Sequence, residues 1–180
     1  MFLAGMMEDL SQVSVAYRVR MIDFMRTILA GTTSAVIPLI KLFKEGDKEE
    51  LNITGMAVFK GDKMIGRISN DDSLGYIWAL KKTKKSNLVL GEGPDMAVLH
   101  MPTLGCKRKV TLRPDGGISV ALKLKGTANL IELRGFAEMA PKELIPLLEE
   151  MGREAIKGKI MGTFESAKAL NADIFGFGAT

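Results

Sequence analysis

Few side chains in this sequence could do chemistry. The 180 residues include one histidine, His100, and one cysteine, Cys106. A single cysteine excludes an internal disulfide framework and a multi-cysteine metal site. His100 lies in an apolar run between Leu99 and Met101. This setting favours a core or edge histidine over a general base, because a base needs a positioned partner.

Two acidic pairs and one glycine-rich turn could also carry chemistry. Asp71-Asp72 precedes an apolar segment, so we interpret the pair as a helix cap rather than a catalytic or metal-binding pair. Glu149-Glu150 lies on a predicted helix, where adjacent side chains point apart. Gly91-Glu92-Gly93 lacks the following Gly-Lys-Ser/Thr of a phosphate-binding loop. The sequence therefore predicts no enzyme, with no catalytic, cofactor-binding or metal-binding residues and no cofactor.

The basic residues are clustered. Lys and Arg number 25 against 21 Asp and Glu, and the densest cluster contains Lys81, Lys82, Lys84 and Lys85. Lys107-Arg108-Lys109 forms a second cluster, and Lys123 and Lys125 alternate on a predicted strand. Such clusters can contact anionic lipid, and they can equally be solvated surface. No aromatic residue is interleaved to stack a base, so we expect no nucleic-acid partner.

Hydrophobic periodicity defines the elements at the N-terminal end. Apolar residues recur every three to four positions over 9–29, which predicts a helix that stops at Gly31. An extended segment follows, with Pro38 at an edge position. We place a domain boundary here, so that 1–35 is an N-terminal helical segment or the end of a preceding domain, and 36–180 is the main domain. The apolar start lacks a basic leader and no stretch is long enough for a membrane span, so we expect a soluble chain.

The rest of the chain alternates as strands do and ends in a helical pattern. Strands are predicted over 51–60, 64–69, 87–90, 96–101, 107–113, 118–125 and 129–134, with clear hairpins at 61–63 and 114–117. Helices are predicted over 73–80 and from Pro141 to about 170. The apolar stripe of the long helix is interpreted as core; it comprises Ile145, Leu148, Ile156, Ile160, Phe164 and Ala167. These patterns predict an α+β fold, with a mostly antiparallel β-sheet packed against a long C-terminal helix and a shorter helix.

Four short stretches resemble one protein family in the same order along the chain. They are GMAVFKGDKMIG at 55–66, LGYIW at 74–78, NADIFGFG at 171–178, and VRMIDF at 19–24 followed by VIP at 36–38. Together they resemble the Ger(x)C family of spore germination proteins, the lipoprotein C subunits of nutrient germinant receptors. Family members carry a signal peptide, a lipobox cysteine and further N-terminal domains. The sequence therefore looks like the C-terminal domain of such a subunit, and Cys106 is internal and cannot be the lipid attachment site.

The resemblance implies a non-enzymatic receptor subunit that acts by protein-protein contact in nutrient-triggered germination. Its partners would be the membrane-spanning receptor subunits, on the outer face of the spore inner membrane, to which a lipid anchor outside this sequence would tether it. Phe175 and Phe177 alternate in the closing motif, so both rings can lie on one face of a short extended tail, against either the core edge or a partner. Two alternatives stay open. One is a germinant-sensing pocket lined by Gly91-Glu92-Gly93-Pro94 and His100, and the other is an adaptor that binds anionic lipid through its lysine clusters.

Overall fold

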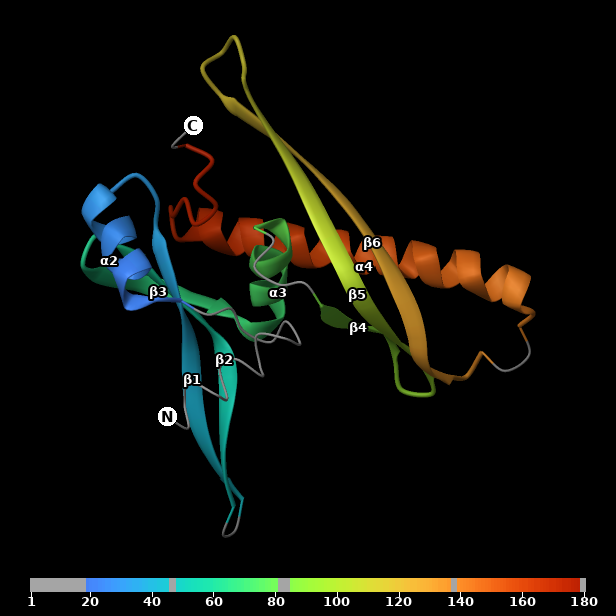
Figure 1. Ribbon diagram of the computed structural model, residues 1–180. Coiled ribbons are helices and arrows are strands. Elements are labelled where there is room, and N and C mark those ends of the chain that lie inside the picture. The colour runs from blue at the N-terminus through green and yellow to red at the C-terminus, as the bar shows by residue number, and fades with distance from the viewer. Residues whose placement is uncertain (1–18, 46–47, 81–84, 137–138, 179–180) are drawn as a thin grey trace.

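A computed structural model describes residues 19–45, 48–80, 85–136 and 139–178. Its strands form two three-stranded antiparallel sheets, in the orders β1-β2-β3 and β4-β5-β6. Helix α3 lies between the two sheets, and the long helix α4 runs across the molecule (Figure 1). The α+β class is therefore confirmed, although the strands divide between two sheets rather than forming one.

The first sheet contains β1 (Ala35–Glu45), β2 (Lys48–Lys60) and β3 (Lys63–Ser69). Strand β1 is at the edge, where Pro38 is tolerated because one side of an edge strand needs no amide donor. The predicted hairpin between β2 and β3 is confirmed. Helix α2 (Met21–Ala30) ends at Gly31, whose φ of 65° is the left-handed conformation that glycine accepts easily. Positions 9–18 of the predicted helix lie outside the described residues.

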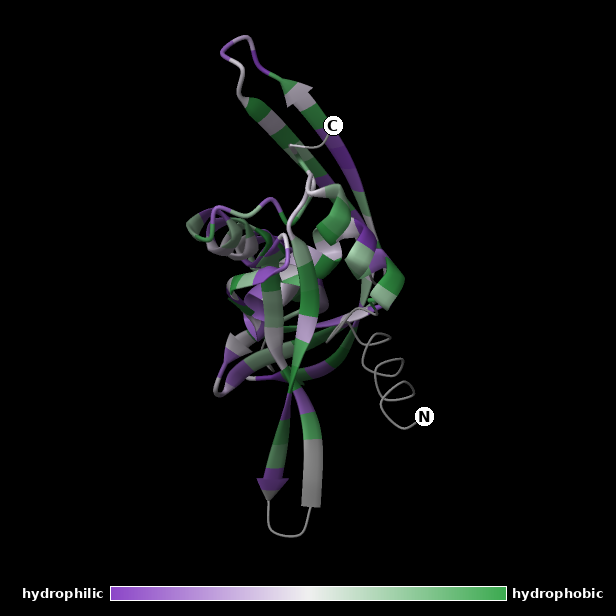
Figure 2. Cartoon of the chain, turned by 90° about the vertical axis from the view of Figure 1, so that its left-hand side faces the viewer, coloured by the Kyte–Doolittle hydropathy of each residue, from purple (hydrophilic) through white to green (hydrophobic). Residues whose placement is uncertain are grey.

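The second sheet contains β4 (Ser86–Glu92), β5 (Asp95–Leu112) and β6 (Ile118–Arg134). Several strands predicted separately are continuous here, because β5 joins 96–101 to 107–113 and β6 joins 118–125 to 129–134. Register shifts near His100 absorb the irregular pairing within these long strands. The β1–β2 and β5–β6 hairpins extend away from the body in opposite directions (Figures 1 and 2).

Helix α3 (Asn70–Ala79) is capped by Ser69, whose side-chain oxygen accepts a hydrogen bond from the Asp72 amide at 3.1 Å. The prediction that Asp71-Asp72 forms the cap was therefore wrong. These residues lie in the first turn, where they connect α3 to α4 (Pro141–Ala169). Asp71 forms an ion pair of 2.5 Å with Lys159, and the Asp72 carboxylate accepts a hydrogen bond from Ser166 at 3.0 Å.

Two glycines allow α3 and α4 to approach closely. A Cβ on Gly75 would lie 2.7 Å from the Ile160 Cα and closer still to Thr163 and Lys159. A Cβ on Gly162 would lie 2.5 Å from an Asp72 carboxylate oxygen. Gly158 faces open space, so close packing does not account for the glycine at that position.

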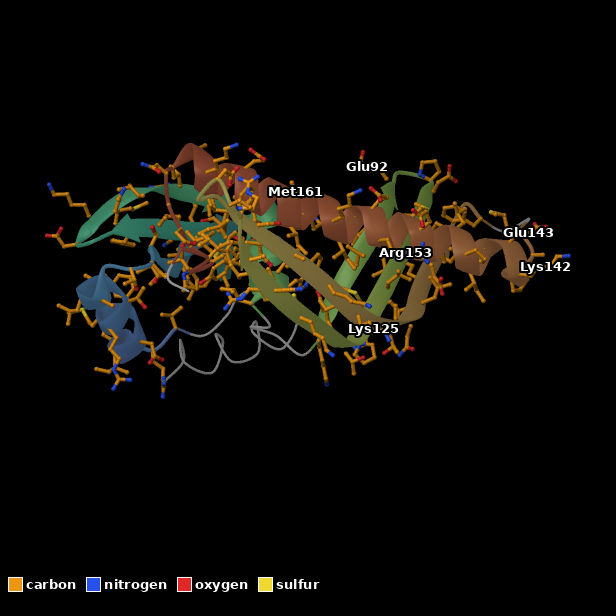
Figure 3. All side chains as sticks on the ribbon, turned by 90° about the horizontal axis from the view of Figure 1, so that it is seen from above. Glu92, Lys125, Lys142, Glu143, Arg153 and Met161 are labelled. Carbon is orange, nitrogen blue, oxygen red and sulfur yellow. The ribbon has the colours of Figure 1, made fainter. Side chains whose placement is uncertain are left out.

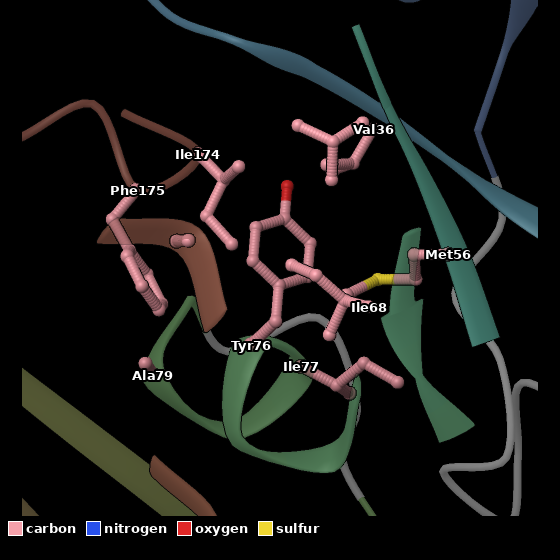
Figure 4. Packing of buried hydrophobic residues seen from close by; sticks show 10 residues of the cluster. Val36, Met56, Ile68, Tyr76, Ile77, Ala79, Ile174 and Phe175 are labelled. Carbon is pink, nitrogen blue, oxygen red and sulfur yellow. The ribbon is translucent and has the colours of Figure 1, made fainter. Parts of the chain in front are cut away.

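Two hydrophobic cores meet at α3. The first, shown in Figure 4, joins Tyr76 and Ile77 to the first sheet and to the C-terminal tail. The second joins Trp78 to β4, β5 and the N-terminal half of α4. The buried Trp78 indole N–H donates a hydrogen bond to the Ser86 hydroxyl at 3.0 Å. One short helix therefore contributes large buried side chains to both cores.

Candidate protein-contact surfaces

A groove of about 1030 Å³ separates α4 from β6. Strands β4, β5 and β6 form one wall, and α4 forms the other. The large apolar side chains of the strand wall are Leu88, Leu99, Met101, Leu104, Val120, Leu122, Leu124 and Leu130. Those of the helix wall are Leu144, Ile145, Leu148, Ile156, Ile160 and Met161. The groove is therefore lined mainly by leucine, isoleucine and other apolar residues from the second sheet and α4.

Much of this apolar surface is open to solvent. The Ile145 side chain is 58% exposed and Met161 is 50% exposed, whereas Leu148 is buried. The prediction that the whole apolar stripe of the long helix belongs to the core is therefore wrong for part of it. On β6, Leu122 and Leu124 are only half-buried, so the inner face of this strand is incompletely covered. Contiguous apolar surface of this kind is typical of interaction sites.

Four charged side chains line the groove, namely Lys125, Glu149, Arg153 and Lys157. Figure 3 labels Arg153 and Met161 on α4 and Lys125 on β6, all of which line it. Arg153 is paired within its own helix, with Glu149 at 3.2 Å and with Glu150. No histidine or cysteine lines the groove. The mainly apolar walls can bury an apolar segment.

The closing motif forms a second cluster beside the first core. Phe175 is buried, with its ring centroid 5.8 Å from that of Tyr76. The half-buried Phe177 ring stacks on Phe175 at 5.0 Å. Arg108 of β5 donates a hydrogen bond to the Phe175 carbonyl at 3.1 Å, and its guanidinium lies 5.7 Å from the Phe177 ring centre. The structure thus places Phe175 in the core and Phe177 at its edge.

The C-terminal tail is turned rather than extended, which corrects the predicted shape. Gly176 has a φ of 68°, and the Asp173 carboxylate accepts hydrogen bonds from the amides of Phe177 and Gly178 at 3.0 and 2.7 Å. The Ser34 amide donates to the Asp173 carbonyl at 2.9 Å. A cavity of about 480 Å³ lies beside this turn and is lined in part by Phe177. The hydrogen bonds to Asp173 hold the turned backbone in place, and in this turn the Phe175 and Phe177 rings stack.

Only some of the remaining predicted contact residues fall within the part of the chain that the structure describes. Lys81, Lys82 and Lys84 lie outside the described residues, and Lys85 is exposed just before β4. The His100 Nδ1 lies 2.8 Å from the Asn87 side-chain oxygen across the β4–β5 pair. The exposed 91–94 turn lies at the other end of that hairpin, and neither it nor His100 lines the groove or the 480 Å³ cavity.

The described residues also lack two other kinds of site. Among the helices that the structure describes, none combines the length and hydropathy that a membrane span requires. No group of three or more His, Cys, Asp or Glu side chains in the described ranges is arranged to hold a metal ion.

Comparisons with known proteins identify one family. A family model described as "Spore germination B3/GerAC like, C-terminal" matches residues 54–180. The structure entitled "Crystal Structure of the GerBC protein" is 14% identical, with a TM-score of 0.63 over 83% of this chain and 45% of that chain. At this identity the likeness shows a shared fold, and the sequence spans less than half the length of GerBC. No curated protein matches the sequence.

Proposed function

The chain belongs to the GerAC-like family of spore germination proteins, and on this premise we propose that it is a non-catalytic subunit of a germinant receptor acting by protein contact. The single observation that carries this proposal is the open apolar groove between α4 and β6. Its walls expose leucine, isoleucine and methionine side chains that burial against a partner would remove from water.

The groove suits a protein segment better than a nutrient molecule. A small polar germinant needs a few converging hydrogen-bonding groups to fix its orientation. Here the lining is mostly apolar, and three of its four charged side chains, Glu149, Arg153 and Lys157, are already paired within α4. An amphipathic helix can place its apolar face in such a groove and its polar face in water. The proposed occupant is therefore an amphipathic segment of another subunit of the same receptor.

The family also suggests where the domain works. The proposed location is the outer face of the spore inner membrane, beside membrane-spanning subunits, with a lipid anchor supplied by sequence outside this chain. The proposed division assigns 1–35 to a preceding segment and 36–180 to this domain. It is supported by β1, which begins at Ala35 and pairs with β2, the strand in which the family match begins at residue 54.

Two adjacent residues of β6 allow a matched test of the groove. Leu130 lines the groove and is 44% exposed, whereas its neighbour Ile131 does not line it and is 59% exposed. In the intact receptor, Leu130→Glu should abolish co-purification of the other subunits and slow nutrient-triggered germination, because a buried unpaired carboxylate opposes association. Ile131→Glu should leave both unchanged.

A second pair repeats the test on the other wall. Ile145→Glu changes the helix wall, and Leu147→Glu places the same charge on α4 outside the groove. Circular dichroism of all four purified variants checks that each remains folded. Retention of the complex by both groove variants, or equal losses for groove and control variants, would reject the groove as the contact surface.

A further inference from the structure

Strand β6 forms a free edge of the second sheet. In the described part of the chain it pairs only with β5, and the register is continuous between 105–112 of β5 and 118–125 of β6. An edge strand directs the N–H and C=O groups of alternate residues away from its own sheet, where another strand can pair with them. The free edge of β6 is therefore a template for a further strand.

The closing turn of the β5–β6 hairpin shows which residues direct these groups outward. The Arg113 amide donates a hydrogen bond to the Gly117 carbonyl at 2.7 Å, so these two residues form a hydrogen-bonded pair. Hydrogen-bonded and non-hydrogen-bonded pairs alternate along an antiparallel ladder. Lys123 therefore belongs to a pair that is hydrogen-bonded to β5, whereas Leu122 and Leu124 direct their N–H and C=O groups toward the free edge.

This edge borders the apolar groove. Five consecutive residues of β6, 124–128, line the groove, and because alternate side chains point to opposite faces, the lining includes the backbone edge itself. Helix α4 packs instead against β4 and β5, where a Cβ on Gly152 would lie 3.8 Å from Leu99 and 4.0 Å from Leu88. The N-terminal end of α4 continues past β6 (Figure 1). A strand added at the free edge would therefore enter the groove.

The two faces of β6 determine the chemistry of such a strand. Val120, Leu122 and Leu124 line the groove on one face, and the exposed Lys123 and Lys125 alternate with them on the other, although Lys125 also borders the groove. Neither lysine forms an ion pair within the described ranges. Side chains that are neighbours on adjacent strands interact directly, and opposite charges stabilise such a pair. A complementary strand therefore has apolar residues beside the leucines and acidic residues, two positions apart, beside the lysines.

We propose that the free edge of β6 pairs with an extended segment of another receptor subunit in which apolar and acidic residues alternate. This inference rests on the proposed function, and it specifies the conformation and the sequence pattern of the segment that occupies the groove. The added strand places its apolar side chains over α4 and its carboxylates beside Lys123 and Lys125. Its backbone supplies hydrogen-bond partners for Leu122 and Leu124.

Two other occupants fit less well. A helix would fill the apolar groove, but it would take water from the outward N–H and C=O groups of β6 without replacing their hydrogen bonds. A second copy of β6, paired antiparallel at the same edge, would bring the lysines of both copies onto one face, where like charges repel. The lysines therefore oppose self-pairing and favour an acidic partner strand.

The test uses this chain with synthetic octapeptides, whose binding is measured by fluorescence anisotropy. The probe alternates valine and glutamate. One control peptide has four valines followed by four glutamates, and the other has lysine in place of glutamate. The alternating acidic peptide should bind at least about tenfold more tightly than either control. Equal binding of the alternating and the block peptide would overturn the proposal, and would leave the edge lysines as charges that only prevent self-pairing.

Two pairs of exposed lysines on the same face of the sheet provide matched variants. Lys123→Gln with Lys125→Gln removes the charges beside the free edge and should weaken binding of the probe about 2- to 30-fold. Lys107→Gln with Lys109→Gln makes the same change on β5. It should weaken binding less than about twofold, because β5 lies about 10 Å from the added strand, roughly the screening length of salt. Equal losses in the two variants would indicate general attraction to a basic surface and would overturn the strand pairing.

Amide hydrogen exchange measured by NMR distinguishes a paired strand from a helix. With the alternating peptide bound, the amides of Leu122 and Leu124 should exchange at least about tenfold more slowly, because they gain hydrogen-bond acceptors. The Lys123 amide, which already faces β5, should show no comparable change. Binding without protection of the two leucine amides would contradict the pairing.

The intact receptor separates this inference from the proposed function. Leu130→Glu and the double variant Lys123→Glu with Lys125→Glu should both prevent co-purification of the other subunits. Loss of the complex with Leu130→Glu alone would reject the added strand and keep the groove as the contact surface. Retention of the complex by the groove variants is the result that rejects the proposed function itself.

Discussion

At the scale of single residues, Trp78 and Ser86 show how the second core handles polar groups. The Trp78 indole is almost fully buried, and its N–H has the Ser86 hydroxyl as its hydrogen-bond acceptor. A buried donor without an acceptor destabilises the folded state, because its lost hydrogen bonds to water are not replaced. This pair therefore fixes the orientation of the largest side chain in the core.

Ser86→Ala should lower the free energy of unfolding by about 1–3 kcal/mol, because it leaves the indole N–H unpaired. Ser119→Ala, at an exposed site on β6, should change it by less than about 0.5 kcal/mol. Urea unfolding followed by Trp78 fluorescence measures both. Equal effects of the two substitutions would contradict the assigned role of the hydrogen bond.

Local residue chemistry could be predicted where it depends on neighbours in sequence. Gly31 ends α2 and Pro141 begins α4, as expected from their backbone preferences. Ser69 was missed as a cap because the adjacent acidic residues have equal capping ability. Arg108 was grouped with its lysine neighbours, but alternation sends it to the opposite face, where it meets Phe175 across 67 positions. Such a contact has no signal in a single sequence.

At the scale of elements, the contact between α3 and α4 depends on the absence of side chains. Gly75 lies against the α4 backbone, and the Thr163 hydroxyl donates a hydrogen bond to the Asp72 carbonyl at the same contact. The hairpins could be predicted because their turns are local. The division into two sheets could not, because alternation shows which side chains face inward but not which strands pair. The groove was missed for the same reason, since it depends on how far α4 lies from β6.

Gly75→Ala should destabilise the protein by about 1–3 kcal/mol, because the new methyl group would overlap backbone atoms of α4. Gly158→Ala should stabilise it by about 0.5–1 kcal/mol, because that position is open and alanine favours the helix. Thermal unfolding by circular dichroism compares the two variants directly. A stabilising effect at Gly75 would show that α3 and α4 do not approach as described.

At the scale of the whole molecule, α3 couples the two sheets. It supplies Tyr76 and Ile77 to one core and Trp78 to the other, and six of its ten residues are buried. Loss of packing in either core would therefore expose buried side chains of α3, which would also weaken the other core. The family resemblance found in the ordered motifs agrees with the family match. The matched residues 54–180 contain the motifs at 55–66, 74–78 and 171–178.

This coupling predicts a single unfolding transition. Ile77→Ala in the first core and Leu88→Ala in the second should each lower the free energy of unfolding by about 2–5 kcal/mol. Trp78 fluorescence and far-ultraviolet circular dichroism should report the same midpoint in both variants. Two separated transitions, with Leu88→Ala affecting only one of them, would show that the sheets unfold independently.

The length of α4 has a mechanical consequence. Its 29 residues rise about 44 Å, and α3 holds its C-terminal half against the body. A neighbour seated in the groove along α4 would therefore be connected to the first sheet through one continuous helix. In such an assembly, a displacement of the neighbour would move α4 and both sheets together rather than one sheet alone.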